Sequence, residues 1–225
     1  MPEKIFADQQ EVFERLEESA AEVRYRGIRR DSKWAEHWGC FSVALEHPAE
    51  TAAAIENISR RIAEIVPAVV YCAKHVHTTL CLCDYRPGFF FNPEDRVQQG
   101  ILRGLIQGVG NALKEVGRVS CVVEFCRCFC LSTKIDLVGR PDEQFVCLVE
   151  AVRRGCENEG ITMDPVWPHI TMSRFVEDAL DCPKFEFLEN ISRLGFGQVP
   201  TVSVAVGYSD WPSGNGHFTV VERFP

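Results

Sequence analysis

Two short stretches of the sequence share an alternating pattern. Residues 69–83 read VVYCAKHVHTTLCLC, and residues 166–175 read VWPHITMSRF. Both stretches are rich in apolar and β-branched residues, which predicts a strand in each. Side chains at positions i and i+2 of a strand point to the same face. His77 is therefore expected beside Thr79, and His169 is expected beside Thr171.

The two His-x-Thr sites occupy corresponding places in a repeated pattern. Their histidines are 92 positions apart. The same shift brings the strand predicted at 40–45 onto the one predicted at 132–137, and it brings the helix starts at Pro48 and Pro141 to within one position. Side-chain identity between the halves is low, so the repeat is one of architecture. A duplicated α+β unit would place the matching strands side by side, with both histidines facing one cleft.

The other elements follow from periodicity and from the positions of proline and glycine. Helices are expected at residues 8–24, 48–65, 94–116, 141–160 and 185–194. Strands are expected at residues 38–45, 69–83, 119–125, 128–137, 166–175, 199–208 and 217–224, with a break near Arg127 and a turn at 213–216. Gly100, Gly104 and Gly108 form a smooth stripe on one helix, which predicts that this helix packs closely on a sheet.

Paired imidazoles and hydroxyls are suited to acid–base chemistry on a phosphate. An imidazole has a pKa of about 6.5, so two of them can divide into a neutral base and a protonated acid near neutrality. Threonine hydroxyls donate hydrogen bonds to the non-bridging phosphate oxygens that carry negative charge. One His-x-Thr in a strand usually reflects ordinary packing, whereas two copies at matching positions favour catalysis. The arrangement needs no metal or cofactor, and it leaves open which histidine is the base.

With these motifs the sequence resembles the two-histidine (2H) phosphoesterases, which include LigT-like 2′-5′ RNA ligases and cyclic nucleotide phosphodiesterases. The family signature is His-x-Thr/Ser followed by a hydrophobic residue, twice, and both copies are complete as His77-Thr78-Thr79-Leu80 and His169-Ile170-Thr171-Met172. The resemblance covers about residues 38–224. It implies an α+β fold, bilobal and pseudo-symmetric, in which two antiparallel sheets flank a central groove with helices outside. Residues 37–225 are then the phosphoesterase domain, built from two interleaved lobes, and residues 1–36 are a helical extension.

The resemblance also implies an activity, the metal-independent hydrolysis of a phosphodiester. The bond is often a 2′,3′-cyclic or 2′-5′ linkage in a nucleotide or RNA, and His77, Thr79, His169 and Thr171 are then the catalytic residues. A protein of another class, an inactive module that binds nucleotides or RNA ends in the same groove, remains the alternative. Intact histidines in both halves favour catalysis, because binding alone needs no acid–base pair. The motifs do not determine base preference or the choice between hydrolysis and ligation.

Four further residues are candidate substrate contacts. Arg174 lies three positions after Thr171, so it reaches the same face only if a turn or bulge redirects it. Arg127 is a second candidate for a phosphate contact. Phe89 and Trp211 are candidates for stacking on an unpaired base.

Histidine and cysteine spacing also raises the question of a metal. His75 and His77 form a His-x-His pair, but no His-x-His-x-Asp follows, so His75 is expected at the edge of the groove and no metal site is expected.

Eleven cysteines include no CxxC pair. The sets 81/83 and 126/128/130 alternate, which predicts buried thiols on one face of a strand. Free thiols favour a reducing compartment, the cytoplasm.

Composition and charge narrow the class of partner. A hydrophobic fraction of 46% with 25% charged residues is typical of a soluble globular protein, and no apolar run approaches the roughly 20 residues of a membrane span. The charged N-terminal segment is not expected to be a secretory signal. A net charge of −8 argues against long duplex nucleic acid, which requires many phosphate contacts. A nucleotide or a short RNA is compatible with that charge, and protein partners are not indicated.

Overall fold

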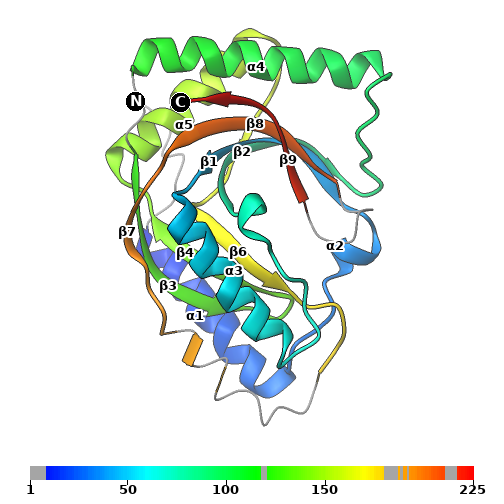
Figure 1. Cartoon of the computed structure of the whole chain (residues 1–225), viewed down its shortest axis with the longest axis vertical. Helices are drawn as coiled ribbons and strands as arrows, with labels where there is room; N and C mark the ends of the chain where they lie inside the picture. Colours follow the sequence, from blue (N-terminus) through cyan, green and yellow to red (C-terminus); the bar gives the residue numbers. More distant parts are fainter. Residues whose placement is uncertain (1–8, 118–120, 180–186, 188–189, 192, 211–216) are drawn as a thin grey trace.

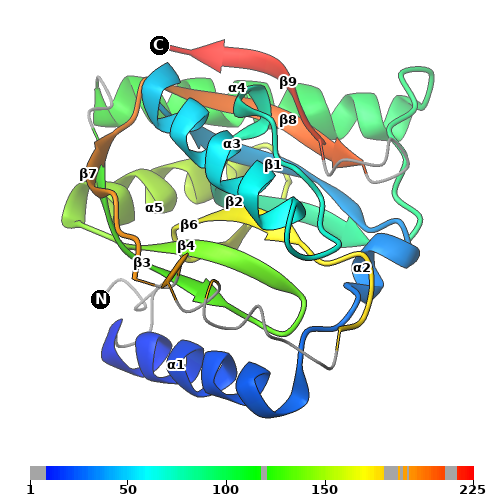
Figure 2. The same cartoon turned by 60° about the horizontal axis from the view of Figure 1, so that its bottom comes forward.

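The chain folds into two antiparallel sheets with helices packed around them (Figure 1, Figure 2). The computed structural model describes residues 9–117, 121–179, 187, 190–191, 193–210 and 217–225. The helices are α1 (Gln9–Arg26), α2 (Ser32–Ala35), α3 (Ala49–Ala63), α4 (Arg96–Val116), α5 (Glu143–Asn158) and the 3-10 turn η1 (Ala73–His75). The strands are β1 (Gly39–Glu46), β2 (His77–Arg86), β3 (Val122–Cys130), β4 (Lys134–Arg140), β5 (Asp164–Pro165), β6 (His169–Arg174), β7 (Gly197–Pro200), β8 (Ser203–Asp210) and β9 (His217–Phe224).

The sheet order confirms the predicted α+β fold with two antiparallel sheets. One sheet has the order β5-β2-β1-β8-β9 and the other has the order β6-β4-β3-β7, with antiparallel pairing throughout. In each half a strand, a helix and a second strand follow one another, and the two strands pair: β1 with β2, and β4 with β6. The next strand of each half crosses over, because β3 pairs with β4 and β8 pairs with β1. The two halves are therefore interleaved.

Local sequence explains where the main helices begin. The Asp95 side chain accepts hydrogen bonds from the amides of Val97 and Gln98, and it caps α4. The Asp142 side chain accepts from the amide of Phe145 and caps α5 in the same way. Figure 1 shows α4 above the first sheet, and Figure 2 shows α1 beneath the second. Among the described residues no helix is long and apolar enough to cross a membrane.

The predicted break at Arg127 is wrong. Strand β3 runs through it, and the chain instead turns at residues 131–133, where the amide of Leu131 donates to the carbonyl of Lys134. Cys126 is the extra residue of a bulge. Arg127 is an exposed residue of a half-buried strand, and its guanidinium forms an ion pair with Glu17 at 2.7 Å. A polar residue on the outer face of a strand was thus mistaken for a turn.

The single strand predicted at 199–208 is also wrong, because it is two strands in different sheets. β7 ends at Pro200 and β8 begins at Ser203. Between them the amides of Thr201 and Val202 donate to the carbonyls of Cys121 and Glu46, so the chain passes from one sheet to the other. Most of the helix predicted at 185–194, and the turn predicted at 213–216, lie outside the described residues.

The glycine stripe packs on a helix rather than on the predicted sheet. A Cβ at Gly108 of α4 would lie 2.8 Å from the backbone of Cys156, and a Cβ at Gly155 of α5 would lie 2.3 Å from the carbonyl oxygen of Gly108. The backbones of α4 and α5 therefore touch at this crossing. A Cβ at Gly100, one end of the predicted stripe, would have no described atom within 4 Å.

Replacing Gly155 by alanine is expected to lower the free energy of unfolding by about 2 kcal/mol, because overpacking at a backbone contact outweighs the better helix propensity. The matched control is Gly100→Ala, where space is open and propensity alone is expected to raise stability by up to about 1 kcal/mol. Urea denaturation of both variants measures the two effects. Equal stability of the two would contradict backbone contact between α4 and α5.

The N-terminal segment is helical, as predicted, and it packs on the second sheet. Phe13 of α1 meets Phe129 of β3 edge to face, with ring centroids 5.8 Å apart. The following residues are held by backbone hydrogen bonds, among them those of Ile28 with Ala179. The amide of Asp31 donates to the carbonyl of Phe175, directly after β6. This segment therefore reaches the strand that carries the second His-x-Thr motif.

Candidate active site

A bulge follows the threonine of the first motif. The register of β2 on β1 slips between Thr79 and Cys81, so Leu80 is the extra residue. Before the bulge Thr78 is buried and points away from Thr79, as predicted. After it the alternation is reset, and Leu82 returns to the face of His77 and Thr79.

The second motif has the same bulge at the same place. The register of β6 on β4 slips between Thr171 and Ser173, so Met172 is the extra residue. Arg174 is thereby returned to the face of Thr171, although an unbroken strand would point it the other way. The fourth, hydrophobic position of each motif is therefore the buried residue of a bulge. The bulge that Arg174 needed in order to reach the groove is present.

The two strands meet at one cavity of about 220 Å³. It contains both histidines and both threonines of the motifs, together with Arg174, all from the predicted set. The other residues that line it are Lys33, Cys40, Tyr71, His75, Leu82, Tyr85, Lys134, Val166 and Ser209. The cavity is thus built from both sheets and from α2.

Both histidines are held in the same tautomer. Nδ1 of His77 lies 2.7 Å from the carbonyl oxygen of His75, and Nδ1 of His169 lies 2.8 Å from the carbonyl oxygen of Trp167. A carbonyl oxygen only accepts, so each Nδ1 carries a proton and donates it. Each ring therefore keeps Nε2 as the nitrogen that gains or loses a proton. The ring of His77 also packs on Phe218 of β9, with centroids 4.5 Å apart.

Burial keeps His77 neutral. Burial, together with the neighbouring His169 and His75, lowers the pKa of His77 to about 4 against the opposing effects of the His75 carbonyl and of Glu46. The carboxylate of Glu46 accepts hydrogen bonds from Arg223 at 2.8 Å and from Ser203 at 2.6 Å. At neutral pH, Nε2 of His77 is therefore an unprotonated base.

His169 differs because a buried carboxylate lies near it. Burial lowers the pKa of His169, as do the charges of Lys134 and Arg174, while Asp136 raises it. Asp136 is 4% exposed and its Oδ2 lies 2.5 Å from Nζ of Lys134. In the part of the chain that the structure describes, Oδ1 of Asp136 has no hydrogen-bond partner. The carboxylate therefore favours the protonated form of His169 in part, and the pKa of His169 stays below its ordinary value because burial has the larger effect.

This charge pattern breaks the symmetry of the two halves. Asp136 pairs with Thr171 across β4 and β6, and the matching partner of Thr79 is Ala44. Likewise Lys134 pairs with Arg174, whereas the matching pair in the first half is Ser42 with Leu82. The histidines and threonines are duplicated, but Lys134, Asp136 and Arg174 have uncharged counterparts in the first half.

Arg174 is fixed in place by residues from two other segments. Its guanidinium forms an ion pair with the buried carboxylate of Asp31, and its Nε donates to the hydroxyl of Tyr71 at 3.2 Å. The charges of Tyr71, Asp31 and Asp136 raise the pKa of Arg174 against the effect of burial, so the group stays positive. The side chain is 14% exposed, which leaves it a surface on the cavity.

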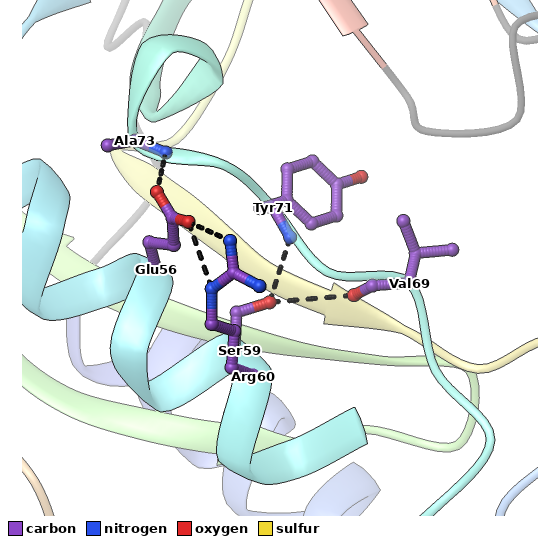
Figure 3. Close-up of polar contacts among 6 residues, drawn as sticks. All are labelled: Glu56, Ser59, Arg60, Val69, Tyr71 and Ala73. Carbon is purple, nitrogen blue, oxygen red and sulfur yellow. Dashed lines mark hydrogen bonds and ion pairs between the residues drawn. The ribbon is translucent and has the colours of Figure 1, made fainter. Parts of the chain in front are cut away.

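Helix α3 positions the segment that carries Tyr71 (Figure 3). The hydroxyl of Ser59 accepts from the amide of Tyr71 at 2.9 Å and donates to the carbonyl of Val69 at 3.5 Å. Glu56 accepts from the amide of Ala73 at 2.7 Å and is itself paired with Arg60. Figure 3 shows the Tyr71 ring pointing away from the helix, on the side opposite to these contacts.

Two predicted contacts are not brought to the cavity, and a third cannot be placed. Arg127 lies on the outer face of β3 against Glu17 of α1. Phe89 is 0% exposed and packs against Phe41 in the core, so it offers no surface for stacking on a base. Trp211 lies outside the described residues. Arg127 and Phe89 are therefore withdrawn as substrate contacts.

Thiols and possible metal ligands can be described for most of the chain. The ten cysteines that the structure describes form no disulfide with one another, as predicted. Cys81, Cys83, Cys128 and Cys130 are buried, whereas the bulge in β3 takes Cys126 out of the predicted alternation. His75 lies in η1 rather than on the strand, and it does line the cavity. In the described ranges no three His, Cys, Asp or Glu side chains are grouped as metal ligands.

Several cavity residues were not predicted from the sequence. Lys134 and Asp136 alternate in a strand, and they lie more than thirty positions upstream of the second histidine, so their nearness depends on the pairing of β4 with β6. Lys33 and Tyr71 come from irregular segments with no motif. Knowledge of the strand register would have identified Lys134 and Asp136. No local signal in the sequence marks Lys33 or Tyr71.

Comparison with known proteins gives matches in structure only. The sequence matches no protein-family model, and it has no significant match among curated proteins. E. coli LigT complexed with 3′-AMP is similar with a TM-score of 0.55 and 17% identity, over 83% of this chain and 97% of LigT. TT0787 of Thermus thermophilus is similar with a TM-score of 0.57 and 18% identity, over 82% of this chain and 96% of that protein. A phosphoesterase is similar with a TM-score of 0.52 and 18% identity, over 83% and 97%.

These similarities confirm, at the level of the fold, the resemblance that the two motifs suggested. The chain has the fold of LigT and related phosphoesterases. At 15–18% identity the similarity concerns the fold, and the activity has to be argued from the residues of this chain.

Proposed function

We propose that this protein is a metal-independent phosphodiesterase that acts on a 2′,3′-cyclic or 2′-5′ phosphodiester of a nucleotide or short RNA. One observation carries the proposal. Both histidines donate Nδ1–H to backbone carbonyls, which leaves two Nε2 atoms on one cavity beside two threonine hydroxyls. This set supplies a base, an acid and donors for a phosphate without any other group.

The different surroundings of the histidines assign their roles. Nε2 of His77, which is neutral, takes a proton from water as the water oxygen bonds to phosphorus. Nε2–H of His169, favoured by Asp136, gives its proton to the ribose oxygen as the phosphorus–oxygen bond breaks. The product is a phosphomonoester, and exchange with solvent returns both rings to their starting protonation states. Thr79, Thr171 and Arg174 donate hydrogen bonds to the non-bridging oxygens, whose negative charge is concentrated in the transition state.

The structures similar to this one support a nucleotide as the substrate class. LigT has been described in complexes with 3′-AMP, with ATP and with NADP+. In the present chain Lys33, Lys134 and Arg174 line the same cavity as the histidines, although the net charge of the protein is −8. A local cationic lining within an acidic protein fits a small anion better than a long duplex.

The assigned roles predict the effect of Asp136→Asn on the pH profile. The low-pH limb of kcat/KM reports protonation of His77, and the high-pH limb reports loss of the proton from His169. Removing the carboxylate disfavours the imidazolium of His169, so the high-pH limb should move to lower pH while the low-pH limb stays in place. Asp164→Asn, an exposed change outside the cavity, is the control and should move neither limb. A shift of the low-pH limb alone would reverse the two roles.

The activity itself is tested with a panel of substrates in excess EDTA. We expect turnover of 2′,3′-cyclic nucleotides or 2′-5′ linked oligonucleotides, at a rate unchanged by further chelation. Tight binding across the panel with no turnover would contradict the proposal and favour the inactive nucleotide-binding module. Activity that EDTA abolishes and a divalent metal restores would contradict the metal-independent mechanism.

A further inference from the structure

Lys33 is the residue of the cavity that the short helix α2 supplies. The side chain of Asp31 caps this helix by accepting from the amide of Lys33 at 3.1 Å. The Lys33 ammonium lies 4.7 Å from the ring centroid of Tyr85 and 5.6 Å from that of Trp38. The two rings themselves pack at 4.8 Å. Lys33 is therefore held on an aromatic platform with its charge toward the cavity.

Lys33 differs from the other two cations of the cavity in having no carboxylate partner. Lys134 is paired with Asp136, and Arg174 is paired with Asp31. Within the described part of the chain no acidic side chain forms an ion pair with Lys33, and its nearest described partners are the two rings. Burial and the charge of Arg174 lower the pKa of Lys33, and the nearby carboxylate of Asp31, which is paired with Arg174, opposes them only in part. The folded protein therefore holds this ammonium at an electrostatic cost. An anion bound between Lys33 and Arg174 would offset that cost.

The anion would sit on the side of Arg174 away from the histidines, while the reacting phosphate lies on the side toward them. The charge of Arg174 acts on both Lys33 and Tyr85, so these three groups lie near one another. Arg174 is five positions from His169 on β6, which is at most about 16 Å along a strand of roughly 3.3 Å rise per residue. The cavity therefore has a histidine end and a cationic end, and Ser209 lines it together with Lys33 and Tyr85.

We propose that Lys33 belongs to a second phosphate site, so that the preferred substrate carries a phosphomonoester in addition to the phosphodiester that is cleaved. This rests on the proposed function in that it names the substrate class of the same cavity. A phosphomonoester carries close to two negative charges near neutrality and accepts several hydrogen bonds. It suits a lone ammonium beside a guanidinium better than a singly charged diester does.

The test compares adenosine 2′,3′-cyclic phosphate carrying no, one or two phosphates at its 5′ position. For the wild-type protein, kcat/KM for the preferred 5′-phosphorylated form is expected to exceed that for the unphosphorylated form by about tenfold. This is the effect of one charge-assisted contact. Lys33→Met should reduce that ratio to near one, because it lowers kcat/KM for the phosphorylated forms more than for the unphosphorylated form. Lys33→Arg keeps the charge and should retain most of the preference. Lys114→Met, an exposed change on α4, removes the same charge elsewhere and should leave the ratio as in wild type.

Binding of the matching products separates this inference from the proposed activity. Calorimetric Kd values for adenosine 2′-phosphate with and without 5′-phosphates should show the same Lys33-dependent ratio, whether or not any form is turned over. Absence of turnover with this ratio intact would count against the activity and for the second site. A ratio near one in wild type, a ratio that Lys33→Met leaves unchanged, or an equal loss for all forms would overturn the second site.

Discussion

Alanine at either His77 or His169 is expected to lower kcat by about 10²- to 10⁴-fold, the usual contribution of a positioned general acid or base. The reason is that each ring supplies one of the two proton transfers through Nε2. The measurement is the initial rate on a 2′,3′-cyclic nucleotide in EDTA, with thermal unfolding as a check on the fold.

The double variant and a surface histidine complete this comparison. Residues that act as one unit give effects that do not add, so the double variant should be little worse than the poorer single variant. His37→Asn is the control, because His37 is exposed, lies outside the cavity, and has a φ of 52° that asparagine tolerates. Single variants that keep full activity would show that the rings do not carry the proton transfers.

Replacing Arg174 by methionine is expected to lower kcat/KM by about 100-fold, on the scale of losing one preorganised donor to a developing charge. The same change should also destabilise the protein by about 3–5 kcal/mol, because it leaves the buried carboxylate of Asp31 without its partner. Steady-state rates and urea denaturation measure the two effects separately.

A second substitution distinguishes catalysis from stability at Arg174. Adding Asp31→Asn removes the uncompensated charge, so the double variant should regain much of the stability but none of the activity. Arg127→Met, on the outer face of β3, is the matched control. Its effects on kcat/KM and on the free energy of unfolding should each be no more than a few tenths of those of Arg174→Met. If the double variant recovered activity, Arg174 would have a structural role only.

Most of the architecture could be predicted because it depends on local patterns. Apolar alternation around the motifs marks strands β2 and β6, and the aspartates and prolines near residues 48, 95 and 142 mark the helix starts. The interval of 92 positions then predicts that the two strands are equivalents, and the cavity does contain both. The pairing of functional groups could also be predicted locally, because His-x-Thr in a strand is enough to place an imidazole beside a hydroxyl.

The errors came where position depends on distant parts of the chain. The predicted break in the strand at Arg127 is wrong because polarity alone does not distinguish a turn from the exposed face of a strand. Phe89 was proposed to stack on a base, but whether an aromatic residue in a loop is buried depends on Phe41, nearly fifty positions away. The ion pair of Arg174 with Asp31 joins residues 143 positions apart, and no spacing in the sequence indicates it.

The bulges after the two threonines explain a feature of the motif itself. A hydrophobic residue in the fourth position is buried as the extra residue, and this returns the side chain two places further on to the cavity. In one half that side chain is Leu82, and in the other it is Arg174. In the proposed mechanism the repeated motif provides the acid–base pair, and the differences at equivalent positions provide the asymmetry that a directional reaction requires.

The most direct test of the central claim is nitrogen NMR of the protein labelled with ¹⁵N at histidine, recorded with and without adenosine 2′-phosphate. Signals of His77 and His169 are identified from the alanine variants. We predict that both rings carry their proton on Nδ1 in the free protein, and that both Nε2 resonances shift when the nucleotide binds. A ring without a proton on Nδ1 in the free protein, or a nucleotide that binds without moving both Nε2 resonances, would contradict the account.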